Sequence, residues 1–174
     1  MRKALQILGV LNDEDINWLI RNGEREAHPP GAVIIHEGKP IDALMIVLEG
    51  QFTVSTQRNK KVASLYSGEI LGEISMIDRQ PPSATVTAVR ESCVLKIQRR
   101  TLERRLETDT PFAARFYRAV ALFLADRLRT TVSNLGYGEV VVNDNYGALD
   151  DDSMGMMSEA AARFDRMLKY THAA

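Results

Sequence analysis

The sequence predicts a mainly β fold, a sandwich or barrel, with helices before and after it along the chain. Between residues 32 and 98, short apolar or alternating runs are separated by turn signals such as Glu37-Gly38 and Glu49-Gly50. Short strands that recur about every 8–12 residues are typical of these fold classes. No long helices alternate with the strands, so a doubly wound parallel sheet is not expected. The expected strands are residues 33–35, 43–48, 52–55, 62–66, 84–89 and 93–97.

A helical region is expected before the strands, over residues 3–22. Leucine and isoleucine side chains recur there on one helical face. Asn12 and Asp15 have the spacing of an N-terminal cap, so they are expected to open a second short helix. Pro29-Pro30-Gly31 then ends the helical region, because proline cannot continue a helix.

A long amphipathic helix is expected after the strands. A short helix over residues 101–107 precedes it, and Thr110 is expected to cap the long helix, with Pro111 at its first position. The long helix should run to about Asn134. Its apolar face either lies on the chain's own barrel or pairs with a second copy. The length favours pairing, so a homodimer through residues 111–134 is expected. The apolar stripe consists of Phe112, Phe116, Val120, Phe123, Leu124, Leu128, Val132 and Leu135.

The C-terminal part of the chain changes composition. Residues 139–159 hold six acidic side chains and no lysine or arginine. A final helix is expected over about residues 158–170, with Ala161, Phe164, Met167 and Leu168 on one side. The favoured interpretation is a solvated linker that ends in a helix docked on the body, and the alternative is a tethered lid or partner-docking element. The predicted division is therefore a domain over residues 1–135 and an appendage over 136–174.

Composition excludes several classes of function. The 174 residues suit one core, and a net charge of −1 gives no bulk reason to bind nucleic acid or an anionic membrane. No apolar run has the length of a membrane span, and the N-terminus does not resemble a secretory signal. Cys93 is the one cysteine, which fits a reducing compartment, so a cytoplasmic location is expected. Neither a metal site nor a catalytic constellation is evident, so the chain is expected not to be an enzyme.

Residues 68–88 carry the pattern of a ligand cradle. Gly72-Glu73 is followed ten residues later by Ser83-Ala84. A carboxylate accepts hydrogen bonds from hydroxyls, while a serine hydroxyl and free backbone N–H groups donate to phosphate oxygens. Such a cradle normally includes a fixed arginine, but Pro82 stands directly before Ser83.

The order of these features resembles the cyclic nucleotide-binding domain family over roughly residues 10–135. The resemblance rests on the turn glycines in order, on Gly72-Glu73-Ile74-Ser75, on Ser83-Ala84-Thr85-Val86, and on the long helix that follows. It implies a jelly-roll β-barrel, a phosphate-binding cassette between two strands, and a C-terminal helix that moves with ligand. Transcription factors built on this domain add a helix-turn-helix, but residues 139–174 are too short and too acidic for one, so DNA is not an expected partner.

The resemblance also assigns residues to the cassette. It implies that Gly72 lets the backbone approach the sugar-phosphate, that Glu73 accepts the ribose 2′-hydroxyl, and that the Ser83 hydroxyl and Ala84 amide hold the cyclic phosphate. Glu73 could alternatively satisfy free N–H groups at a helix start. Further implied positions are Ile74 and Ser75 at the start of the cassette helix and Val62, Leu65, Leu71 and Val86 as apolar walls.

Pro82 occupies the place of the family's arginine. Proline has neither a side-chain nor a backbone donor, and loss of a charge-assisted pair of hydrogen bonds costs about 1.5–3 kcal/mol for each bond. Arg79, Arg127 and Arg129 are the candidates to replace that cation.

Two functions follow as expectations. The first is a non-enzymatic regulatory module that senses a cyclic nucleotide, cAMP or cGMP, or a related phosphorylated ligand, and that signals through the long helix to an effector protein. The second is a degenerate, ligand-free domain that acts as a dimeric protein-interaction scaffold. No cofactor is expected in either case.

Overall fold

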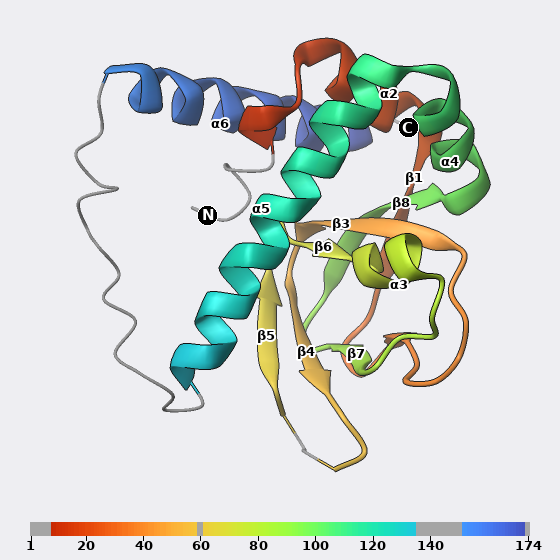
Figure 1. Ribbon diagram of the computed structural model, residues 1–174. Helices are drawn as coiled ribbons and strands as arrows, with labels where there is room; N and C mark the ends of the chain where they lie inside the picture. Colours follow the sequence, from red (N-terminus) through yellow and green to blue (C-terminus); the bar gives the residue numbers. More distant parts are fainter. Residues whose placement is uncertain (1–7, 59–60, 135–150, 173–174) are drawn as a thin grey trace.

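The chain forms two packed β-sheets with helices on one side, as the computed structural model shows (Figure 1). The structure describes residues 8–58, 61–134 and 151–172. Each sheet has four antiparallel strands, in the jelly-roll arrangement expected from the sequence. The first sheet runs in the order β1 (Gly23–His28), β8 (Ser92–Gln98), β3 (Ala43–Glu49) and β6 (Ile70–Leu71). The second sheet runs in the order β2 (Val33–Ile35), β7 (Thr85–Ala88), β4 (Gln51–Ser55) and β5 (Ala63–Tyr66).

Strand β3 is buried on both faces and separates two hydrophobic cores. Side chains alternate across a strand, so Leu44 and Ile46 face the helices while Met45 and Val47 face the second sheet. This double burial explains why the strand is a continuous apolar run in the sequence rather than an alternating one.

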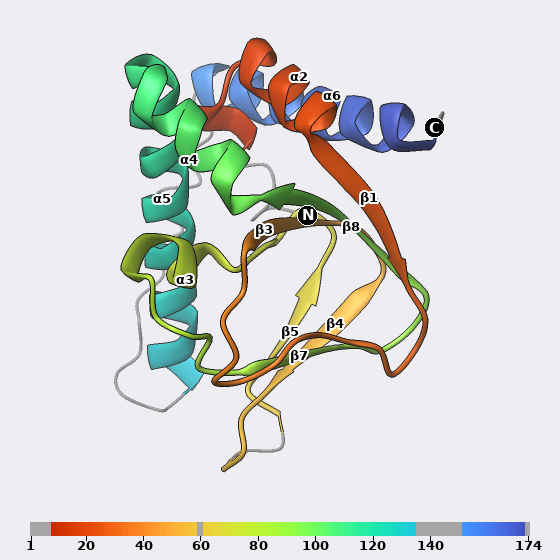
Figure 2. The same cartoon turned by 90° about the vertical axis from the view of Figure 1, so that its right-hand side faces the viewer.

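The helices cover the outer face of the first sheet. Figure 2 shows α5 along one side of the roll, with α2 and α6 crossing at one end. The expected apolar face of α5 is largely used here, because Phe112, Phe116, Val120 and Phe123 are buried against the chain's own core. The helices are α2 (Asp13–Asn22), α3 (Glu73–Asp78), α4 (Arg99–Thr108), α5 (Thr110–Asn134) and α6 (Asp151–His172).

The expected cap of α2 is confirmed. The Asp15 amide donates to the Asn12 side chain over 2.9 Å, and the Asn12 amide donates back to the Asp15 carboxylate over 3.0 Å. Two orphan N–H groups of the first turn are thereby satisfied reciprocally. The cap of α5 was predicted wrongly: Asp109 rather than Thr110 accepts the Phe112 amide, over 2.9 Å.

Two strands and the last helix differ from the sequence-based prediction. Strands β1 and β6 were not predicted, because the first is rich in charged residues and the second has two residues. Helix α6 begins at Asp151 rather than near residue 158, and Ala160 is buried on its inner side while Ala161 is exposed. The predicted stripe residue Leu135 lies outside the described residues.

Candidate ligand-binding site

The cassette helix α3 begins at a glycine that the backbone requires. Gly72 has φ +84°, in the left-handed region. A Cβ atom at this position would lie 2.7 Å from the Ala43 carbonyl oxygen of β3. Conformation and close approach therefore both select glycine, and together they set the direction in which α3 leaves β6.

Glu73, the first residue of α3, is paired with the long helix. The residue is 2% exposed, and the Arg127 Nη1 atom lies 2.5 Å from its Oε1 atom. Burial raises the pKa of the Glu73 carboxyl, and the Arg127 guanidinium opposes that rise. Arg127 also lies over the Phe123 ring, 5.2 Å from its centroid. The carboxylate expected to accept a ribose hydroxyl is thus held by the helix expected to move.

The Ser83-Ala84 segment is fixed by the turn at Gly38. The Gly38 amide donates to the Pro82 carbonyl over 2.8 Å, and the Glu37 amide donates to the Thr85 hydroxyl over 3.1 Å. Within the described part of the chain, neither the amides of Ser83 and Ala84 nor the Ser83 hydroxyl has a hydrogen-bond partner. These donors remain available to a ligand anion.

The apolar residues expected to line the ligand site do not lie on one surface. Leu71, Leu65 and Val86 are buried in the core between the sheets, and Ala84 packs against the edge of that core. Val62 is exposed directly before β5, and its amide donates to the Val54 carbonyl over 2.8 Å.

The remaining cassette residues point toward α4 or toward solvent. Ile74 is half exposed, whereas Ser75 is buried. The side chain of Arg79 is 79% exposed, and its Nη2 atom lies 3.9 Å from the Glu103 carboxylate. Of the three candidate arginines, Arg127 is the one that contacts a cassette carboxylate.

Arg99 is a cassette contact that sequence reasoning missed. Its Nη2 group donates to the Ser75 carbonyl, and its Nε atom lies 3.3 Å from Glu103. The side chain therefore joins α3 to the first turn of α4. Arg99 stands beside Arg100 at the start of α4, and no local pattern in the sequence distinguishes it from this exposed neighbour.

Two other classes of site find no support in the described residues. No three histidine, cysteine, aspartate or glutamate side chains come together there as a metal site would need. None of the helices in the described ranges is long and apolar enough to span a membrane.

Comparison with known proteins identifies the same family that the cassette residues resemble. The family model for the cyclic nucleotide-binding domain matches residues 25–109. An uncharacterized NTE family protein of Mycobacterium tuberculosis is 30% identical over 122 residues, which cover 70% of this chain and 21% of that protein. The HTH-type transcriptional regulator Cmr of Mycobacterium tuberculosis is 28% identical over 114 residues, which cover 64% of this chain and 47% of that one.

Solved structures share the architecture. A cyclic nucleotide-binding domain from Methylobacillus flagellatus superimposes with a TM-score of 0.71 at 23% identity, covering 80% of this chain and 86% of that chain. The N-terminal domain of a transcriptional regulator from Streptomyces coelicolor superimposes with a TM-score of 0.60 at 28% identity, covering 80% and 99%. The chain spans about a fifth to a half of the length of the curated relatives named above. The match over residues 25–109 assigns this part of the chain to the cyclic nucleotide-binding domain family, and the two four-stranded sheets with the long helix after them agree with that fold.

Proposed function

We propose that this chain is a non-enzymatic regulatory module that binds a cyclic nucleotide, cAMP or cGMP, or a related phosphorylated small ligand. The ligand hydroxyls bind Glu73, and its phosphate binds the donors of Ser83 and Ala84. The signal passes through α5 to an effector protein. The observation that carries this proposal is the contact between buried Glu73 and Arg127, because it connects the ligand-binding carboxylate directly to α5.

The Glu73–Arg127 contact makes ligand binding and helix position depend on each other. A ligand hydroxyl that donates to the Glu73 carboxylate competes with the Arg127 guanidinium for the same oxygen atoms. A ligand that changes this contact changes the free energy of keeping α5 against the cassette. By linkage, the position of α5 changes the affinity for ligand by the same factor.

Arg127 also brings a cation to the cassette that Pro82 does not supply. In this proposal the guanidinium that balances the ligand phosphate comes from α5 rather than from the loop before Ser83. Its dependence on helix position is the reason that binding and signalling are coupled. Arg129 is exposed on the same helix and serves as a matched control.

A second apolar stripe on α5 supports the proposed homodimer. The face that packs on the chain's own sheet differs from an outward face that carries Ala114, Tyr117, Ala121 and Leu128. These positions recur at intervals of three, four and seven residues, and Leu128 is 64% exposed. Two alanines on the stripe allow close approach of a second helix. Analytical ultracentrifugation of the wild-type chain and of Leu128→Glu tests this face, and a monomeric wild type at high protein concentration would contradict it.

Isothermal titration calorimetry with cAMP and with cGMP tests the ligand proposal. The wild type is expected to bind, Glu73→Ala to lose binding, and Arg129→Ala to bind as the wild type does. Pro82→Arg is expected to bind at least tenfold more tightly, because it adds charge-assisted hydrogen bonds of about 1.5–3 kcal/mol each. If neither the wild type nor Pro82→Arg gives heat or a thermal shift at millimolar ligand, cyclic-nucleotide sensing is wrong and the ligand-free scaffold remains.

A further inference from the structure

The C-terminal helix α6 lies across α2 with one apolar face covered. Figures 1 and 2 both show the two helices side by side at the end of the roll. Ala160 and Met167 of α6 are fully buried, and Phe164 and Leu168 pack against the same core. The rest of the described α6 surface is polar or exposed, so the helix is amphipathic.

Among the side chains that the structure describes, the Asp13 carboxylate on α2 makes the ion pairs between α2 and α6. Asp13 Oδ1 lies 2.7 Å from Arg163 Nε, and its Oδ2 lies 3.3 Å from Arg166 Nη2. Arg163 also donates to the Leu8 carbonyl over 3.2 Å. The pairing lowers the pKa of the Asp13 carboxyl, mainly through the hydrogen bond from Arg163. The Asp13 side chain is 56% exposed, so water and salt weaken these ion pairs.

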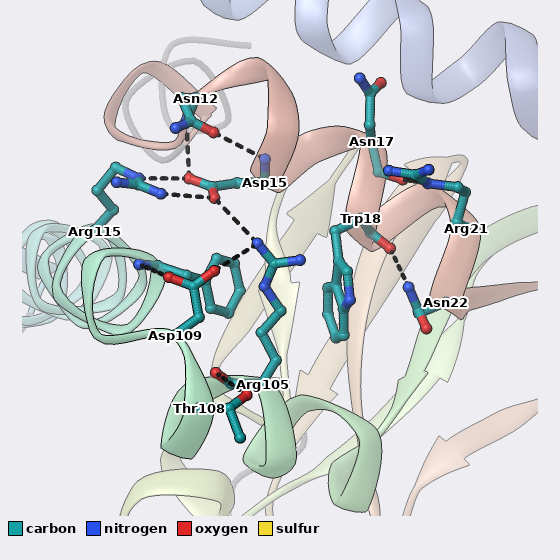
Figure 3. Close-up of polar contacts among 11 residues, drawn as sticks. Asn12, Asp15, Asn17, Trp18, Arg21, Asn22, Arg105, Thr108, Asp109 and Arg115 are labelled. Atoms are coloured by element: carbon teal, nitrogen blue, oxygen red, sulfur yellow. Dashed lines mark hydrogen bonds and ion pairs between the residues drawn. The ribbon is translucent and has the colours of Figure 1, made fainter.

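Two residues further along α2, a buried carboxylate connects this helix to α5. Asp15 is fully buried and binds Arg115 through two hydrogen bonds, of 2.6 and 2.9 Å. Arg105 of α4 lies 4.0 Å from Asp15 and 2.9 Å from Asp109, which caps α5 (Figure 3). The first turn of α2 therefore contacts α6 through Asp13 and the start of α5 through Asp15.

We propose that α6 is an output helix that α2 masks. When α5 shifts, the Arg115–Asp15 contact moves the first turn of α2, and the contacts of Asp13 with α6 weaken. Released α6 presents Phe164 and Met167 flanked by Arg163 and Arg166. The partner that fits this surface is a protein with an apolar groove and an acidic rim, because that is the chemistry of the α2 face that α6 leaves. The trigger rests on the proposed function, while the masking rests on the α2–α6 contacts alone.

Amide hydrogen exchange of residues 158–169 in the full chain tests the masking. Asp13→Lys replaces two attractive ion pairs by repulsion, so exchange is expected to accelerate on the order of tenfold. Glu14→Lys is the matched control, because Glu14 is exposed in the same turn and its electrostatic interaction is with Arg115 of α5, while among the described residues it has no ion pair or hydrogen bond with α6. Asp13→Asn is a milder variant, expected to give an intermediate acceleration. Exchange of α6 that is equal in all four proteins would overturn the masking.

An apolar anion, 8-anilinonaphthalene-1-sulfonate, reports the surface offered to a partner. Dye fluorescence is expected to rise several-fold in Asp13→Lys and to stay at the wild-type level in Glu14→Lys. Adding Arg163→Ala and Arg166→Ala to Asp13→Lys should reduce the signal if the two cations contribute. Dye binding that is indifferent to both cations would refute the acidic rim of the partner.

Ligand addition tests the trigger separately from the masking. In wild-type protein that binds cAMP or cGMP by calorimetry, ligand is expected to change the exchange rate of α6. If ligand binds and this rate does not change, the coupling through α2 is wrong. If no ligand binds, the proposed function fails while the comparison of Asp13→Lys with Glu14→Lys still decides the masking.

Discussion

Removing the guanidinium of Arg127 is the most informative perturbation of this protein. Arg127→Ala leaves the buried Glu73 carboxylate without the cation 2.5 Å from it. A charge-assisted hydrogen bond to a buried carboxylate contributes about 1.5–3 kcal/mol, and the stacking on Phe123 adds about 0.5–1 kcal/mol. The free energy of unfolding at pH 7 should therefore fall by about 2–4 kcal/mol, which lowers the melting temperature of a chain this size by about 5–15 °C.

The loss of unfolding free energy in Arg127→Ala should be larger at high pH than at low pH. Burial already raises the pKa of the Glu73 carboxyl above its ordinary value of 4.5, and removing Arg127 takes away the main opposing effect. A carboxyl with a raised pKa in the folded state binds more protons there than in the unfolded state. Its contribution to stability is fully present below the unfolded pKa and is lost as pH rises through the folded pKa. Arg127→Ala should therefore lose most stability at neutral and alkaline pH and less near pH 5.

Urea denaturation followed by the fluorescence of the one tryptophan, Trp18, measures this loss. Trp18 packs against Phe112, with ring centroids 5.6 Å apart, so it reports on the α2–α5 contact. Arg129→Ala should stay within about 0.5 kcal/mol of the wild type, because its side chain is exposed. Glu73→Gln in the Arg127→Ala background should recover stability at pH 7, since it removes the uncompensated charge. Equal losses in the two arginine variants, or no recovery with Glu73→Gln, would refute the pairing.

Three further predictions follow from single contacts. Gly72→Ala should lower the free energy of unfolding by about 2–4 kcal/mol in chemical denaturation. Gly31 has the same φ of +84°, but a Cβ there would have nothing within 4 Å. Gly31→Ala should therefore lower the free energy of unfolding by about 1–2 kcal/mol, from backbone strain alone. Equal costs at the two glycines would exclude the steric clash. Arg99→Ala should accelerate amide exchange of the cassette helix while Arg100→Ala leaves it unchanged, and acceleration by both would show that no single contact holds α3. Asp15→Asn should lower the free energy of unfolding by about 2–4 kcal/mol in thermal denaturation, because the partner arginines then lose a fully buried anion, and a neutral outcome would contradict that.

The sequence was most informative where local chemistry alone sets the structure. The capping box of Asn12 and Asp15 depends on residues three apart, and it was confirmed. The central strands were predicted because they are apolar runs too short for a typical helix and are bounded by turn residues. The family resemblance rested on the glycine turns and the cassette pattern, and the family match over residues 25–109 confirms it.

Prediction failed where an element depends on a distant partner. Strand β1 pairs in register with β8, from Gly23 opposite Ile97 to His28 opposite Ser92, and that pairing is invisible in its charged local sequence. From the sequence, the apolar stripe of α5 could pack either on the chain's own barrel or on a second copy of the chain. The structure assigns its phenylalanines to the chain's own core and leaves Leu128 outside.

For the candidate site, the sequence determined which groups are present, and the tertiary structure decided how they are connected. Gly72, Glu73 and Ser83-Ala84 were identified from residue type and spacing, because turn geometry and hydrogen-bonding chemistry are local. The pairing of Glu73 with Arg127 joins residues 54 apart in the chain. Any of several arginines could have met that carboxylate, and only the packing of α5 on the first sheet brings Arg127 to it.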